Sequence, residues 1–155
     1  MNDVELSPEA SAAALAFLLR FSRFEYALKM GGYLKSSDAG KKAEPNWDMF
    51  VKRNRNRYEA SPRALSLIAL QPRQQLVVAN AKLAWQPLQF AETEFALQKA
   101  TLLLRLVRNN VFHGGRHDSP WMDQAWTMQV LESGSQVLDE LAAFARLVDA
   151  YEGQR

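Results

Sequence analysis

The sequence predicts an all-α protein, a compact antiparallel helical bundle of four to five main helices. Long segments repeat apolar residues at spacings of three and four, which is the period of an α-helix with one buried face. Ser-Pro pairs precede these segments and Gly-Gly pairs follow them, as expected at helix starts and helix ends. The 155 residues, of which 48% are hydrophobic, fit a single helical domain over 1–155 with a substantial core.

The first helix is expected to begin at Ser7-Pro8 and to end at Gly31-Gly32. One apolar stripe runs along it, formed by Ala10, Ala14, Phe17, Phe21, Phe24 and Leu28. Glu25 borders this stripe, so its carboxylate can face a basic group on a neighbouring helix. Residues 33–45 read as a loop, and Asn46 is expected to cap a second helix.

A third helix is expected to begin at Ser61-Pro62 and to end at Gln71-Pro72. Between about 71 and 90 the sequence predicts a small irregular or hairpin insertion, with two short strands on either side of 79–81.

A fourth helix is expected from about Glu92 to Phe112 or His113, where Gly114-Gly115 stops it. Its apolar residues point in nearly every direction, which predicts burial among other helices. The last long helix is expected to begin at Ser119-Pro120 and to continue through Val148, with Gly134 as a weak point. Together the helices are expected to form two long antiparallel pairs.

Composition restricts the chemistry. The chain has no cysteine, which removes disulfides, thiolate nucleophiles and cysteine-ligated zinc. The start of the sequence is acidic, unlike a signal peptide, and the apolar stretch 12–19 is too short to cross a bilayer. We therefore expect a cytoplasmic protein that makes no membrane contact.

The net charge is only +2, yet basic residues are concentrated in one short segment. That segment contains Lys52, Arg53, Arg55 and Arg57 and no acidic residue. Such a cluster can attract the phosphates of RNA, although a solvated helix face is the commoner explanation for a run of charge.

The most informative segment is 108–113, which places Arg108, Asn109 and His113 at the end of an apolar helix. Buried guanidinium and imidazole groups need either ion-pair partners or an anionic ligand. Arginine binds phosphate through a planar fork, and histidine can both accept and donate a proton near neutral pH. RNA supplies its own nucleophile, the ribose 2′-hydroxyl, so these residue types suit metal-independent RNA cleavage.

These residues resemble a known family. The run from Arg108 to His113 resembles the R-N-x-x-x-H motif of HEPN domains, and residues 21–29 resemble the first-helix segment of prokaryotic HEPN proteins. The resemblance implies one HEPN-like helical domain, a homodimer that brings two motifs together, and an endoribonuclease without a cofactor. It also implies a role as a toxin or antiviral effector, with an antitoxin or defence partner protein.

Under this resemblance Arg108 is the phosphate clamp, His113 the general acid–base and Asn109 an orienting group. Glu25 takes a supporting first-helix position. The run of charge, apart from the resemblance, makes Lys52, Arg53, Arg55 and Arg57 candidates for guiding RNA. The resemblance is also compatible with a second function, a non-catalytic dimerising module that binds RNA or nucleotides in a larger complex.

Structural alternatives exist for these groups. Arg108 can pair with Glu25 across two helices, because buried charges are usually paired. His117 with Asp118 suggests a metal site, but no further histidine or cysteine is present to complete one, so none is expected. The tryptophans at 47, 85, 121 and 126 are assigned to core or interface packing.

Overall fold

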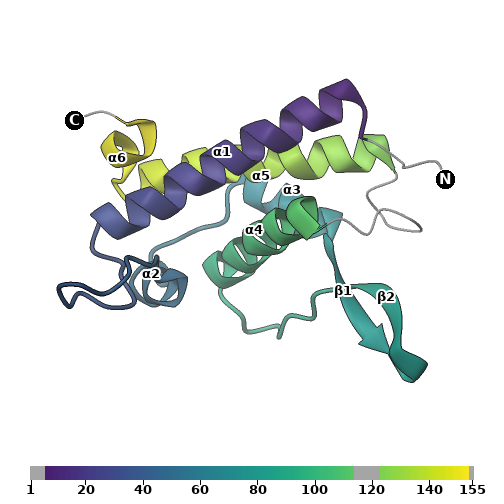
Figure 1. Ribbon diagram of the computed structural model, residues 1–155, viewed down its shortest axis with the longest axis horizontal. Helices are drawn as coiled ribbons and strands as arrows, with labels where there is room; N and C mark the ends of the chain where they lie inside the picture. Colours follow the sequence, from purple (N-terminus) through teal and green to yellow (C-terminus); the bar gives the residue numbers. More distant parts are fainter. Residues whose placement is uncertain (1–5, 114–122, 154–155) are drawn as a thin grey trace.

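The computed structural model describes residues 6–113 and 123–153, and of Phe112 and His113 it describes the backbone. Within these ranges the elements follow in the order α1, α2, α3, β1, η1, β2, α4, α5 and α6 (Figure 1). Their bounds are α1 Pro8–Met30, α2 Trp47–Asn54, α3 Pro62–Leu70, β1 Arg73–Val78, the short 3-10 turn η1 Ala79–Ala81, β2 Lys82–Pro87, α4 Ala96–His113, α5 Gln124–Phe144 and α6 Val148–Glu152.

Local sequence sets the helix starts. Ser7, Asn46 and Ser61 each accept a hydrogen bond from the backbone N–H three residues on, at 3.1, 3.0 and 3.1 Å, which satisfies a donor that the first helical turn would leave unpaired. These three predicted starts are therefore confirmed. Helix α4 begins at Ala96, four residues after the predicted start, because residues 92–93 form a turn.

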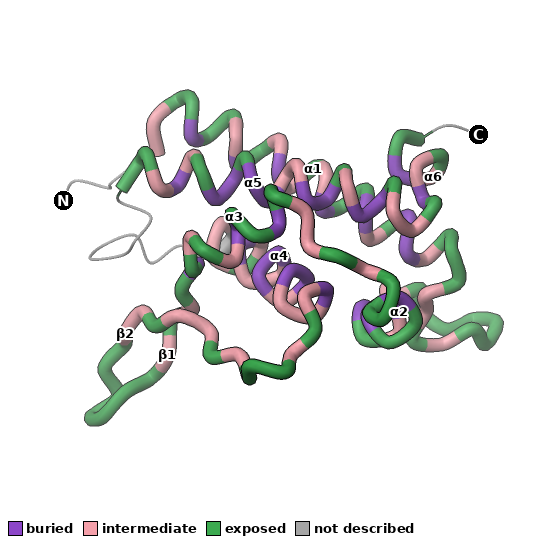
Figure 2. Tube along the Cα trace, turned by 180° about the vertical axis from the view of Figure 1, so that it is seen from behind, coloured by how far each residue is buried: buried purple, intermediate pink, exposed green. Residues whose placement is uncertain are grey.

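The all-α class is wrong, because β1 and β2 form a two-stranded antiparallel sheet with Arg73 opposite Pro87 and Val78 opposite Lys82. The hairpin alternative for this region is confirmed. Asn80 and Ala81 adopt left-handed backbone angles, with φ of 62° and 57°, and this lets the chain reverse within η1. The sheet projects away from the helices, and much of its outer half is exposed (Figures 1 and 2).

The expected antiparallel arrangement is wrong for the two longest helices. Helices α1 and α5 run parallel, because residues later in α1 contact residues later in α5. Phe17 contacts Gly134, and Arg20 contacts Asp139. Helix α3 runs against α5, with Ser61 hydrogen-bonded to Glu140 at one end and Trp126 to Leu70 at the other. A parallel α1–α5 pair is possible because the intervening elements bring the chain back to the same end of the molecule (Figure 1).

The last helix also differs from its prediction. Asp123 caps α5 by accepting a hydrogen bond from the Trp126 backbone N–H at 3.0 Å, whereas Ser119-Pro120 lies outside the described residues. The helix then ends at Phe144, and Arg146 adopts a left-handed φ of 59° before α6 begins. The break lets Leu147 and Tyr151 pack as buried residues, with the Tyr151 ring edge-on to Phe24.

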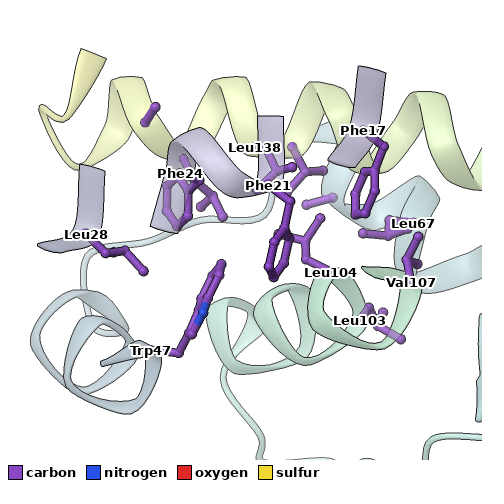
Figure 3. Close-up of a cluster of buried hydrophobic side chains, with 14 of the residues drawn as sticks. Phe17, Phe21, Phe24, Leu28, Trp47, Leu67, Leu103, Leu104, Val107 and Leu138 are labelled. Atoms are coloured by element: carbon purple, nitrogen blue, oxygen red, sulfur yellow. The ribbon is translucent and has the colours of Figure 1, made fainter. Parts of the chain in front are cut away.

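The core lies between α1, α2, α3, α4 and α5, and Trp47 of α2 packs into it (Figure 3). As expected, α4 is buried along its middle, and it contacts α1, α2, α3, α5 and β1. Its fully or almost fully buried apolar residues are Leu97, Ala100, Leu103, Leu104 and Val107. Because this packing fixes α4, the position of its C-terminal turns is fixed as well.

None of the helices in the described part of the chain is both long enough and apolar enough to cross a membrane.

Candidate functional site

The C-terminal turns of α4 bring Arg108 and Asn109 to the surface. Val107 is completely buried, Arg108 is half-buried and Asn109 is exposed, so the helix passes from core to solvent within three residues. Arg108 Nη1 donates a hydrogen bond to Asn109 Oδ1 at 3.2 Å. The two side chains therefore sit together at the rim of the bundle.

His113 is the last helical residue of α4, and its side chain lies outside the described part of the structure. The helical backbone places position 113 one turn beyond Asn109 on the same face, and about 140° around the axis from Arg108. Gly114, Gly115, His117 and Asp118 also lie outside the described residues.

Asn110 ties this end of α4 to the hairpin. Its Nδ2 donates to the backbone oxygen of Arg73, the first residue of β1, at 2.8 Å. Sequence reasoning gave Asn110 no role, because the partner lies 37 residues earlier and only the fold brings them together.

Glu25 has a different partner from the one considered in the sequence. Trp47 Nε1 donates to Glu25 Oε2 at 2.8 Å, while the ion pairs among the described residues are Arg20–Asp139 and Lys42–Glu44. Trp47 in turn packs beside Phe21 and Phe24. Glu25 therefore supports the contact between α1 and α2.

A basic residue that the sequence analysis did not single out lies next to this contact. The Arg105 guanidinium lies 5.9 Å from the centroid of the Trp47 ring, a cation–π distance. Since Arg105 precedes Arg108 by three residues, both arginines belong to neighbouring turns of the same helix.

The arginines of the basic segment around α2 are in contact with aromatic rings. Three of its arginines each lie over a ring from a different part of the chain: Arg53 over Tyr33 at 5.7 Å, Arg55 over Phe95 at 4.7 Å and Arg57 over Phe144 at 4.2 Å. Arg57 also donates to Asn54 Oδ1 at 2.7 Å. Lys52 is exposed.

The distance along α4 separates this segment from the motif. Phe95 directly precedes the first turn of α4, and Arg108 lies near its last turn. At 1.5 Å per residue, about 18 Å of helix separates the two ends. Any RNA contact by Arg55 would therefore be made at the far end of α4 from Arg108.

The hollows in the described part of the structure are lined by residues other than the predicted site residues, and two of them bear on the choice of a site. One of about 250 Å³ is close to the end of α4 and is lined by Leu70, Gln71, Arg73, Asp123 and Trp126. A larger one of about 850 Å³ lies between the end of α1 and α6, and its lining includes Tyr26, Met30, Arg146 and Asp149. The larger hollow is remote from Arg108, so volume alone does not identify the site.

Among the described residues, no group of three or more histidine, aspartate or glutamate side chains is placed to hold a metal ion.

Comparison with models of known protein families, with curated proteins and with solved structures gave no match for this chain.

Proposed function

We propose that the protein is a metal-independent endoribonuclease of the HEPN type that acts in the cytoplasm. The observation that carries this proposal is the position of Arg108 and Asn109, hydrogen-bonded to each other at the solvent-facing end of an otherwise buried helix. A guanidinium held at the rim of a rigid core can receive a phosphate with little loss of side-chain freedom.

In this proposal Arg108 binds the scissile phosphate and stabilises the charge that develops on it. His113 removes the proton of the ribose 2′-hydroxyl or protonates the leaving 5′-oxygen. One histidine supplies one of these two proton transfers, and a second copy of the chain supplies the other in a symmetric dimer. Asn109 orients the Arg108 guanidinium, to which it is already hydrogen-bonded.

The direct test is cleavage of single-stranded RNA in the presence of EDTA, with analysis of the product ends. Attack by the 2′-hydroxyl leaves a cyclic phosphate on one product and a 5′-hydroxyl on the other. We expect His113→Ala and Arg108→Ala each to abolish cleavage while thermal unfolding and oligomeric mass stay unchanged. His117→Ala is the matched control, because it removes the second histidine of the chain and should leave cleavage intact.

Cleavage that needs Mg²⁺, or that yields 5′-phosphate ends, would refute this mechanism. RNA binding without any cleavage would favour the non-catalytic module instead. The biological role belongs to the same proposal: as a toxin or defence effector, the chain should arrest growth when produced alone, and His113→Ala should restore growth.

A further inference from the structure

The smaller hollow beside α4 is bounded by the turn from α3 to β1 and by the start of α5. Its lining residues come from two sequence segments that are 50 residues apart, Leu70, Gln71 and Arg73 on one side and Asp123 and Trp126 on the other. Its volume of about 250 Å³ is below the roughly 300–1,000 Å³ of pockets that enclose a whole small molecule. It is large enough for one flat ring system.

Trp126 gives this hollow a rigid aromatic wall. Its Nε1 donates to the Leu70 backbone oxygen at 3.0 Å, and its backbone N–H donates to Asp123 Oδ1 at 3.0 Å. An indole has a single donor, and here that donor is bonded within the protein. Contact between Trp126 and a ligand in the hollow is therefore made through the ring, as in base stacking.

The two charged residues that line the hollow have opposite signs. Arg73 is an exposed residue of the lining, and a guanidinium suits a phosphate. Asp123 contributes an exposed carboxylate, which repels phosphate but accepts hydrogen bonds from an exocyclic amino group. Adenine, cytosine and guanine carry such an amino group and uracil does not.

The hollow adjoins the predicted motif through one hydrogen bond. Asn110 Nδ2 donates to the backbone oxygen of Arg73 at 2.8 Å. Position 113 lies three residues beyond Asn110, on the neighbouring turn of the same helix face, whereas Arg108 lies about 160° away around the axis. The hollow therefore adjoins the side of α4 that carries position 113.

We propose that this hollow is a nucleobase subsite, in which Trp126 stacks on one amino-bearing base of a single-stranded RNA while Arg73 holds an adjoining phosphate. The inference rests on the proposed function, because it places this base on the side of α4 that carries the proposed general acid–base at position 113. It adds a preference for A, C or G over U at one position of the substrate.

The test measures binding separately from cleavage. Fluorescence anisotropy with labelled 2′-O-methyl oligonucleotides, which lack the nucleophile, compares oligo-A with oligo-U on the unmodified protein. We expect Trp126→Ala to weaken oligo-A binding by about 5- to 150-fold, the range for loss of one stacked base, and Trp126→Phe to stay within about threefold. Asp123→Asn keeps a capping oxygen for α5 and should reduce the preference for oligo-A over oligo-U.

Arg73 is tested by salt dependence. Loss of one phosphate contact should reduce the slope of log affinity against log salt by about 0.7 in Arg73→Ala. Arg63→Ala, which removes an exposed arginine from α3, is the matched control and should leave the slope unchanged. If Trp126→Ala does not fold, Arg73→Ala still tests the phosphate contact, and Trp126→Phe still tests whether an aromatic ring at position 126 is sufficient for binding.

Equal binding of oligo-A by the unmodified protein and by folded Trp126→Ala, or an unchanged salt slope in Arg73→Ala, would overturn the subsite even if the chain cleaves RNA. Conversely, Trp126-dependent binding by a chain that cleaves no RNA would support the subsite and reject the endoribonuclease. The two proposals therefore fail in different ways.

Discussion

Replacing Gly134 by valine tests the close parallel packing of α1 against α5. A β-carbon added at Gly134 would lie 2.9 Å from Phe17 Cε2, 3.2 Å from Phe17 Cδ2 and 3.7 Å from Leu104 Cδ2. The Phe17 ring is completely buried and packs at 6.0 Å from the Phe21 ring, so it cannot turn into solvent. Overpacking of this kind costs about 1–3 kcal/mol, and the two γ-methyls of valine bring the cost near the upper end.

Helix propensity acts in the opposite direction, since valine is favoured over glycine by only about 0.4 kcal/mol in a helix interior. We therefore expect Gly134→Val to lower the free energy of unfolding by about 2–3 kcal/mol, or the midpoint of thermal unfolding by roughly 4–12 °C for a chain of this size. Denaturant unfolding followed by circular dichroism measures the change. Phe17→Leu removes the ring, so the double variant should recover part of the loss as a coupling energy. If Gly134→Val is as stable as the unmodified protein, α5 does not approach Phe17 of α1 as closely as the structure shows.

Three further changes test other parts of the structure. Burial raises the pKa of Tyr58 to about 12, and burial together with the hydrogen bond to Asp139 raises the pKa of Tyr151 further. Because the folded state holds these protons more tightly than the unfolded chain, the contribution of the two tyrosines to stability should be constant below pH 10 and should fall above it. Tyr58→Phe should therefore reduce the loss of stability that denaturant titration measures between pH 9 and pH 11. Glu25→Ala leaves the Trp47 indole N–H without its acceptor and should lower the free energy of unfolding by about 1–3 kcal/mol. Glu25→Gln keeps an acceptor oxygen and should lower it by less. A loss of RNA cleavage at unchanged stability would instead place Glu25 in the active site. Asn110→Ala removes the donor to the Arg73 backbone oxygen, so hydrogen exchange of the β1 and β2 amides should accelerate while exchange of the α1 amides stays the same. Equal exchange of the β1 and β2 amides in the variant and in the unmodified protein would show that this hydrogen bond does not stabilise the hairpin.

The sequence predicted features that depend on neighbouring residues. The caps at Ser7, Asn46 and Ser61, the end of α1 at Gly31 and the reversal near Asn80 are each decided within four or five residues, and each is found. Burial of α4 followed from its apolar residues alone. By contrast, the parallel direction of α1 and α5 depends on how far the intervening elements carry the chain, which periodicity does not encode. The break at Arg146 also escaped prediction, because it is stabilised by burial of Leu147 and Tyr151 against α1 and by no local signal.

The same distinction applies to the candidate site. Arg108, Asn109 and His113 lie on one short stretch of sequence, so their residue types and spacing were sufficient to propose a site. Glu25 could be placed near a basic helix, but the choice between Arg108 and Trp47 as its partner depends on where the loop after α1 delivers α2. Arg73, Asn110 and Trp126 carry no pattern in the sequence, since their connection passes through backbone oxygens of distant residues.

The hairpin gives a physical reason for expecting substrate at this corner of the molecule. A lone two-stranded sheet is marginally stable in water, and here Val77 and Leu83 near its tip are 72% and 61% exposed. Its base is fixed to the motif end of α4 by Asn110, and the turn that leads into β1 is fixed to the start of α5 by Trp126. Both attachments use side-chain donors on backbone oxygens, so the Arg73 side chain is not needed to hold the hairpin in place. Arg73 thus lies on a segment positioned by other groups, and it lines the same hollow as the Trp126 indole. Its guanidinium can serve a ligand phosphate without loss of the hairpin, and for this reason we place the proposed subsite here and not in the larger hollow at α6.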